Sequence, residues 1–156
     1  MRVTICAVGR LRDAPEAGLV RAYLDRFDKA GRGLGLGPAA LREVEDRKGG
    51  GAGAEAALLF QALPPQARLC ALDERGRMLG SPDFAALIAR WRDDGARDAA
   101  FVIGGADGLT AELRARADQL LALGPMVWPH RLARVMLAEQ LYRAATILGG
   151  GPYHRG

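Results

Sequence analysis

The pattern of hydrophobic and polar positions changes its period repeatedly along the chain. Short runs of β-branched and other apolar residues are typical of strands, and segments with apolar residues three or four positions apart are typical of helices. The expected strands cover residues 2–8, 41–45, 68–73 and 98–105, with a short candidate at 125–129. The expected helices cover residues 15–29, 55–63, 82–94, 110–123 and 132–148.

This alternation of strands and helices predicts the fold class. It favours an α/β protein with a mainly parallel sheet and helices on both faces. Residues 98–105 are apolar almost without interruption, as in strands that helices cover on both sides. No internal repeat or linker divides the chain, and 156 residues suffice for one domain with a proper core. We therefore expect a single domain spanning residues 1–156.

Glycine, proline and capping residues mark the expected boundaries of these elements. The glycine-rich stretches 30–40 and 47–53 predict irregular loops, and the turn 74–78 is expected to end the third strand at Asp73. Helices prefer hydroxyl side chains before their first turn, proline inside it and glycine after their last turn. The residues expected in these roles are Ser81, Pro82, Gly95 and Thr110.

Composition and charge narrow the classes of function. Apolar residues make up 49% of the chain and charged residues 26%, which is ordinary for a globular protein. No apolar run approaches the ~20 residues of a membrane span, and the charged first residues predict no signal peptide, so we expect a cytoplasmic protein without membrane contact. The net charge of +4, with twenty Arg against two Lys, favours a polyanionic partner. Cys6 and Cys70 lack the spacing of a metal site or a disulfide framework and are expected in the core.

Two segments follow expected buried strands and are candidates for a ligand site. IGGADGL (103–109) contains glycines that let a backbone approach a ligand closely, and ligands of parallel sheets bind outside the carboxyl ends of strands. LDERG (72–76) ends another strand and can lie beside the same ligand. Ordinary tight turns remain an alternative for both segments. Neither GxGxxG nor a P-loop is present, so the common NAD and ATP sites are not expected.

A third candidate is the apolar loop that precedes the last helix, residues 124–129. Pro125 and Pro129 bracket it, which restricts its shape and removes two backbone donors. Its remaining backbone groups can bind an adenine edge, with Met126 or Trp128 packing on the ring. The loop therefore suits a nucleoside-like cofactor.

Basic and titrating side chains gather on the last helix and beyond it. The tail GGGPYHRG (149–156) carries a phenol, an imidazole and a guanidinium after three glycines, which suits a site better than a frayed end. Glu139 and Arg143 have the spacing of a helix ion pair, and His130 can be a helix-start residue with only a local role. No Ser-His-Asp set and no metal site are expected. The basic residues of this region are His130, Arg131, Arg134, Arg143, His154 and Arg155.

Several motifs together are similar to those of one family. They are LDERG, IGGADGL, the segment WPHRLARVMLAEQLYRA and the terminal PYHRG, and VTICAVGRLRD resembles the family's start. The combination of the PH, YRA and YHR elements is far more specific than any glycine pattern. The chain thus resembles, over essentially its full length, the RlmH family of ribosomal RNA methyltransferases.

The resemblance implies a SPOUT-type α/β fold with a C-terminal deep trefoil knot, and a homodimer. It implies use of S-adenosylmethionine to methylate N3 of a pseudouridine in helix 69 of 23S ribosomal RNA, with the assembled ribosome as substrate. By resemblance, the cofactor is held by Leu72, Gly105, Gly124, Pro125, Met126, Val127, Trp128 and Pro129. The tail is expected to complete an active site across the dimer interface, with His154 as base or proton relay. The catalytic candidates are Tyr153, His154, Arg155 and Arg143.

Other functions stay open at the level of sequence. One is a SPOUT methyltransferase that acts on another RNA, and a second is a non-catalytic ribosome-binding module that keeps the fold. A small-molecule enzyme with a nucleotide cofactor is disfavoured, because the common nucleotide motifs are missing. Cofactor binding separates an enzyme from the binding module, and the identity of the methylated nucleoside separates the RNA targets. The modest charge favours specificity supplied by a dimer or by a composite ribosomal surface.

Overall fold

The strands of the protein form one parallel sheet with the order β2-β1-β4-β3-β5. The structure is a computed structural model that describes residues 1–155. The strands are β1 (Arg2–Val8), β2 (Ala39–Val44), β3 (Arg68–Met78), β4 (Asp98–Ile103) and β5 (Gln119–Ala122). The helices are α1 (Pro15–Gly31), α2 (Gly51–Ala62), α3 (Ser81–Asp93), α4 (Ala111–Arg116) and α5 (His130–Leu148). The expected α/β class with a parallel sheet is therefore confirmed.

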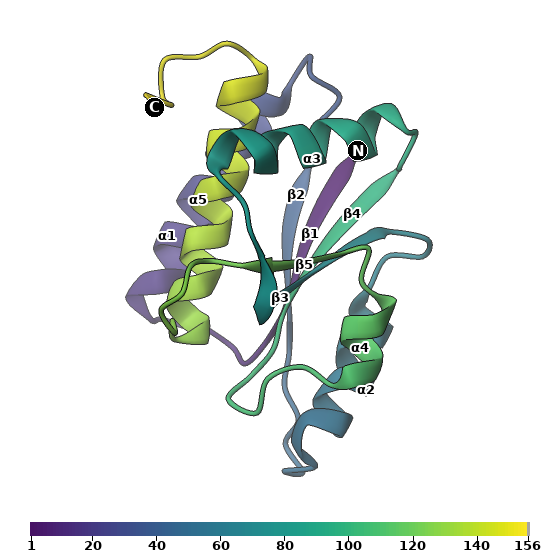
Figure 1. The fold of residues 1–156 in the computed structure, drawn as a ribbon. Helices are drawn as coiled ribbons and strands as arrows, with labels where there is room; N and C mark the ends of the chain where they lie inside the picture. Colours follow the sequence, from purple (N-terminus) through teal and green to yellow (C-terminus); the bar gives the residue numbers. More distant parts are fainter. Residues whose placement is uncertain (156) are drawn as a thin grey trace.

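Helices cover both faces of this sheet (Figure 1). One core cluster joins α1, α3 and α5 to the sheet, and a second joins α2 and α4 to its other face. Strand β4 contributes to both clusters, because successive side chains of a strand point to opposite faces of the sheet. Phe101 packs in the first cluster and Val102 in the second. All six residues of β4 are buried, as its continuous apolar run predicts. The trefoil knot stays a prediction from the resemblance.

The edge of the sheet that β5 forms differs from the sequence prediction. The helix expected over 110–123 ends at Arg116, and residues 119–122 form the strand β5. The strand expected at 125–129 is a loop without regular structure. Pairing of β5 with β3, which lies far away in the sequence, outweighs the helix propensity of Leu and Ala.

Strand β3 is longer than expected and explains this edge. It continues past Asp73 to Met78, with an irregular register between Leu72 and Arg77. Gly76 lies in that irregular stretch, where a Cβ atom would come within 2.5 Å of a backbone atom of Leu121. Only glycine allows the two backbones to approach so closely. The segment expected as a turn is therefore part of the pairing with β5.

Other boundaries also shift by a few residues. Strand β2 begins at Ala39 and helix α2 at Gly51, so both expected glycine-rich loops are shorter than predicted. Ser81 is not a capping residue, because Gly80 precedes α3 and the Ser81 hydroxyl donates to Gln140 Oε1 at 2.7 Å, joining α3 to α5. Thr110 does cap α4, since its hydroxyl accepts from the Leu113 N–H at 3.3 Å.

Both cysteines are core residues, as expected. Cys6 and Cys70 are fully buried on opposite faces of the sheet. Burial raises the pKa of the Cys6 thiol to about 11 and that of Cys70 to about 12, so neither is a thiolate at neutral pH. Among residues 1–155, no helix is long and apolar enough to cross a membrane.

Candidate functional site

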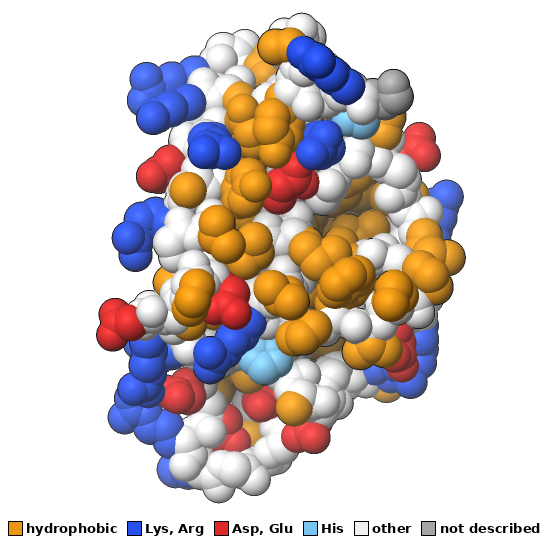
Figure 2. All heavy atoms as spheres, turned by 90° about the vertical axis from the view of Figure 1, so that its left-hand side faces the viewer, with side chains coloured by type: hydrophobic (Ala, Val, Ile, Leu, Met, Phe, Trp, Pro, Cys, Tyr) orange, Lys and Arg blue, Asp and Glu red, His pale blue; other side chains and the backbone are white. Residues whose placement is uncertain are grey.

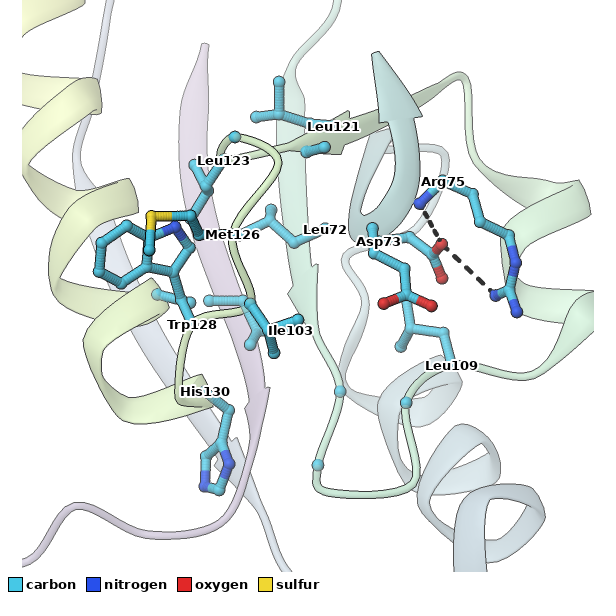
Figure 3. A pocket seen from close by; sticks show the side chains of 18 of the residues that line it. Leu72, Asp73, Arg75, Ile103, Leu109, Leu121, Leu123, Met126, Trp128 and His130 are labelled. Atoms are coloured by element: carbon cyan, nitrogen blue, oxygen red, sulfur yellow. Dashed lines mark hydrogen bonds and ion pairs between the residues drawn. The ribbon is translucent and has the colours of Figure 1, made fainter. Parts of the chain in front are cut away.

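A cavity of about 570 Å³ opens at the carboxyl ends of β3 and β4. Three segments form most of its wall, residues 72–75, 103–109 and 121–128. Figure 3 shows Met126 and Trp128 on one side of the cavity and Asp73 on the other. Its volume is typical of a small-molecule or cofactor site. The position is the one expected for ligands of parallel sheets.

The cavity collects the residues that the resemblance assigns to the cofactor. Seven of the eight line it, namely Leu72, Gly105, Gly124, Pro125, Met126, Val127 and Trp128. The eighth, Pro129, does not line it and instead precedes the first residue of α5. Segments that are distant in sequence therefore meet at one cavity, which the sequence alone did not show.

Strand register builds the apolar part of the wall. Leu72 of β3 lies opposite both Ile103 of β4 and Leu121 of β5. These three aliphatic side chains are therefore neighbours in register, and all three line the cavity (Figure 3). An adenine or another flat apolar group can rest on such a surface.

The glycines after β4 are required by the local packing. A Cβ on Gly105 would lie 3.0 Å from the carboxylate oxygens of Glu55 and from a methyl group of Val8. A Cβ on Gly104 would lie 3.0 Å from the backbone of Gly108. Side chains at these positions would therefore crowd the protein itself, for Gly105 on the side where Glu55 and Val8 lie. Burial and nearby carboxylates, first that of Asp107, raise the pKa of Glu55.

The loop between β5 and α5 contributes free backbone donors. Among the described residues, the N–H groups of residues 126–128 donate to no protein acceptor. The side chains of Met126 and Trp128 are 71% and 41% exposed, so they can move onto a bound ring. Backbone donors beside an aromatic side chain suit the recognition of a nucleobase.

The opposite wall of the cavity carries a paired carboxylate. Asp73 is nearly buried and accepts the backbone N–H of Arg75 at 2.9 Å. The guanidinium groups of Arg75 and Arg114 lie 3.6 and 3.7 Å from its carboxylate. Its negative charge is therefore balanced before any ligand enters. In the part of the chain that the structure describes, no three acidic, histidine or cysteine residues form a group that could hold a metal ion.

The predicted catalytic residues form a separate cluster against α5. The Tyr153 hydroxyl donates to Glu139 Oε1 at 3.0 Å, and Arg143 donates to the same oxygen at 2.6 and 3.0 Å. The Arg143 guanidinium also lies 4.7 Å from the centre of the Tyr153 ring and 3.5 Å from His154 Nδ1. The expected ion pair of Glu139 and Arg143 is present. Arg155, in contrast, is exposed, and its side chain makes no hydrogen bond or ion pair with the other described residues.

Tyr153 is held in its neutral form by this cluster. Burial and the hydrogen bond to Glu139 raise the pKa of Tyr153 to about 12. Its hydroxyl therefore donates a hydrogen bond at neutral pH and is not a base. In the same cluster, the hydrogen bond to Glu139 raises the pKa of Arg143, which keeps its charge.

This tail cluster does not meet the cofactor cavity within one chain. Glu139 and Arg143 follow the start of α5 at His130 by nine and thirteen residues. At 1.5 Å per residue, the cluster lies about 14–20 Å along the helix from the cavity. None of the four predicted catalytic residues lines the cavity. Figure 1 shows the C-terminal tail at the opposite end of α5 from its start.

His130 and Arg134 are the site residues whose roles the sequence left undefined. His130 begins α5 and lines the cofactor cavity (Figure 3). Arg134 is fully buried, donates to the backbone oxygens of Val8 and Gly9 at 3.0 Å, and pairs with Glu43 at 2.9 Å. The helical period held a signal for this burial, because Arg134 falls on the apolar face of the helix.

We expect His130 to be neutral at physiological pH. Burial, and then the charges of Arg134 and Arg131, lower the pKa of His130 below the ordinary value of 6.5. The folded state therefore favours the neutral imidazole, and this contribution to stability is lost as the pH falls below 6.5. The ring protons of the protein's two histidines, followed by NMR between pH 4 and 8, measure this directly. The variant His154→Ala assigns the signals, and a midpoint above 6.5 for His130 contradicts the expectation.

Comparison with known proteins defines the class and then the family. Residues 1–154 match the model of a family described as "Predicted SPOUT methyltransferase". Solved structures share the fold: a probable methyltransferase from Bordetella pertussis Tohama I covers 92% of this chain and 96% of its own, at 20% identity and a TM-score of 0.53. A probable methylase family protein from Haemophilus influenzae Rd KW20 covers 99% of this chain and 70% of its own, at 13% identity and a TM-score of 0.50. The fold and the match to the family model define a methyltransferase of the SPOUT class.

Curated relatives identify the family within that class. The protein from Dinoroseobacter shibae is 65% identical over 155 residues, and that from Ruegeria pomeroyi is 66% identical over 155 residues. Each match covers 99% of both chains, and both relatives carry the name "Ribosomal RNA large subunit methyltransferase H". The chain belongs to the RlmH family, as the motifs predict, and it is a ribosomal RNA methyltransferase.

Proposed function

We propose that the protein transfers a methyl group from S-adenosylmethionine to N3 of a pseudouridine in helix 69 of 23S ribosomal RNA. The substrate is the assembled ribosome in the cytoplasm, and residues 1–156 act as one SPOUT domain within a homodimer. One observation carries the proposal: seven of the eight residues that the RlmH motifs assign to the cofactor meet at one cavity. The name of the close relatives supports ribosomal RNA as substrate.

The cavity fits S-adenosylmethionine by its chemistry. The ligand has a flat adenine with a polar edge, and the loop 126–128 offers free N–H groups beside Trp128. Leu72 and its two neighbours in register supply an apolar support for the ring. Gly104, Gly105 and Gly108 line the cavity, so the rest of the ligand can contact the backbone there. When bound, S-adenosylmethionine supplies an electrophilic methyl group on a positively charged sulfur.

A homodimer explains why the tail cluster lies far from the cavity. The tail of one subunit completes the site of the other if the start of one α5 lies near the end of its partner's. An exposed apolar surface is available for this contact, as Figure 2 shows on the face that carries α5. Among the large exposed apolar side chains of the described residues are Met126, Val127 and Trp128 in the loop before α5, Leu132 on α5 and Met78 at the end of β3. A groove of about 410 Å³ between the end of β3 and α5 continues the surface.

The tail residues have chemically distinct parts in the transfer. The N3–H proton of the base must leave as N3 bonds to the methyl carbon and the carbon–sulfur bond breaks. His154 accepts that proton on an imidazole nitrogen and passes it to water. Arg143 or Arg155 stabilises the negative charge that develops on the base. Tyr153 stays neutral and, with Arg143, fixes the Glu139 carboxylate.

The test is transfer of labelled methyl groups to assembled ribosomes that lack their own helix 69 methylation. We expect label in the large-subunit RNA, recovered as N3-methylpseudouridine after digestion to nucleosides. Label in another nucleoside means that the enzyme acts on a different RNA position. Absence of label despite binding of S-adenosylmethionine rejects the proposed substrate. Absence of both label and cofactor binding favours the non-catalytic ribosome-binding module.

A further inference from the structure

A second cavity adjoins the cofactor cavity at the start of α5. It has a volume of about 450 Å³ and lies between the loop 9–14 after β1 and the first turns of α5. His130 lines both cavities, so the two share a wall. Nothing in the proposed function so far uses this second cavity.

Positive charge dominates the second cavity. Its charged lining residues are Arg10, Arg12, Asp13, Glu45, Arg131 and Arg134. Arg10 and Arg12 share one carboxylate, with nitrogens 3.5 and 3.7 Å from Glu45, and Arg47 approaches the same carboxylate at 3.8 Å. Arg131 is exposed and makes no ion pair among the described residues. The guanidinium groups therefore outnumber the carboxylates that could neutralise them.

The start of α5 adds to this positive potential. A helix N-terminus carries unsatisfied N–H groups and a partial positive charge, so acidic side chains are favourable there. The first turn of this 19-residue helix contains no acidic residue. It contains His130 and Arg131 instead, which is unfavourable for helix stability. Such a conflict with a local rule is typical of a binding site for an anion.

The buried Arg134 side chain is an independent indication of an anion. It is 0% exposed, yet it lines the second cavity. Its terminal nitrogens donate to Glu43 and to the backbone of β1, but its Nε has no hydrogen-bond partner among the described residues. A buried charged donor without a partner is costly. An anion in the cavity can offset that cost through its charge.

We propose that the second cavity binds a backbone phosphodiester of the RNA substrate, next to the nucleotide that is methylated. This inference rests on the proposed function, because it places RNA beside the cofactor cavity. A phosphodiester fits better than a base, since the cavity lining contains no phenylalanine, tyrosine or tryptophan on which a base can stack. Arginine side chains match phosphate oxygens in charge and in geometry. Neutral His130 then separates the phosphate from the cofactor.

The test uses Arg131→Gln, because Arg131 is exposed and its side chain makes no hydrogen bond or ion pair among the described residues. The matched control is Arg97→Gln, an exposed arginine next to the start of β4, at the opposite end of that strand from the cofactor cavity. Binding of a fluorescent single-stranded oligoribonucleotide is measured by anisotropy at several sodium chloride concentrations. We expect Arg131→Gln to weaken binding about tenfold at low salt and to reduce the slope of log affinity against log salt by about 0.7. Arg97→Gln should match the unmodified protein.

Several results overturn the inference. Equal slopes of log affinity against log salt for Arg131→Gln and Arg97→Gln contradict the phosphodiester contact. Absence of RNA binding by the unmodified protein contradicts it as well. If inorganic phosphate shifts the His130 ring signals as strongly as an equal concentration of the oligoribonucleotide, the site binds free phosphate and not RNA. Methyl transfer to ribosomes is measured in parallel. If ribosomes are methylated but Arg131→Gln binds RNA as the unmodified protein does, this site alone is rejected. If RNA binding depends on Arg131 but ribosomes are not methylated, the proposed function alone is rejected.

Discussion

Replacing His154 with alanine is expected to lower kcat for methyl transfer to ribosomes by about a hundredfold, the usual contribution of a general base. The affinity for S-adenosylmethionine should not change, because His154 does not line the cofactor cavity and its polar contact among residues 1–155 is with the Arg143 side chain. Single-turnover transfer of labelled methyl groups measures the first quantity, and calorimetric titration with the cofactor measures the second.

Chemical rescue separates proton transfer from a structural role for His154. Imidazole added to His154→Ala can accept the proton from solution, so it should restore part of kcat in proportion to its concentration. His154→Gln keeps a polar side chain that cannot exchange the proton, and we expect it to be as slow as the alanine variant. An unchanged kcat in both variants removes His154 from the mechanism. If the substitution raises KM for ribosomes and leaves kcat unchanged, His154 acts in RNA binding.

Seven of the eight residues that the RlmH motifs assign to the cofactor line one cavity, and binding of the cofactor there stays a prediction. Ile103 ends β4, and Leu72 lies opposite it in β3, so both stand at the edge where ligands of parallel sheets bind. Gly105 follows two residues later, where an added Cβ would crowd Glu55 and Val8. These signals are local in the sequence. Their meeting at one cavity then follows from the topology of any parallel sheet.

The sheet edge was mispredicted because it depends on contacts between distant residues. Residues 119–122 have good helix propensity, and only pairing with β3 makes them a strand. That pairing needs Gly76, whose position in a predicted turn gave no sign of a close backbone approach. The burial of Arg134 was missed for a similar reason. Its partners Val8, Gly9 and Glu43 lie 126, 125 and 91 positions away from it in the sequence.

The sequence predicted one contact next to the tail, and the catalytic roles of Tyr153, His154, Arg155 and Arg143 stay predictions. The spacing of Glu139 and Arg143 indicated their ion pair, and the structure adds Tyr153 and His154 to it. The distance from this cluster to the cofactor cavity follows from the length of α5. No pattern of residue types states that the two halves of a site lie apart on one chain. This separation is the structural reason to expect a second subunit.

Gly105→Val is expected to weaken binding of S-adenosylmethionine by about tenfold to a hundredfold. The added Cβ meets the Glu55 carboxylate and the Val8 side chain at 3.0 Å, so either these side chains or the cavity-lining loop must shift, and such overpacking is costly. The matched control is Gly18→Val, since a Cβ at Gly18 meets nothing within 4 Å. Calorimetric titration with the cofactor compares the two variants. Equal affinities contradict a cofactor role for the Gly105 loop.

Combining the two defects in different subunits tests whether the site is shared. A heterodimer of His154→Ala and Gly105→Val, made by co-expression with two tags and purified by both in turn, has one subunit with an intact tail and one with an intact cavity. If each tail serves the partner's cavity, one of the two composite sites is fully intact, and activity at low cofactor concentration should return to about half of the unmodified dimer. If each tail serves its own cavity, both sites carry a defect and the heterodimer stays as slow as its parents. Failure to isolate any heterodimer, while each variant folds, contradicts the homodimer itself.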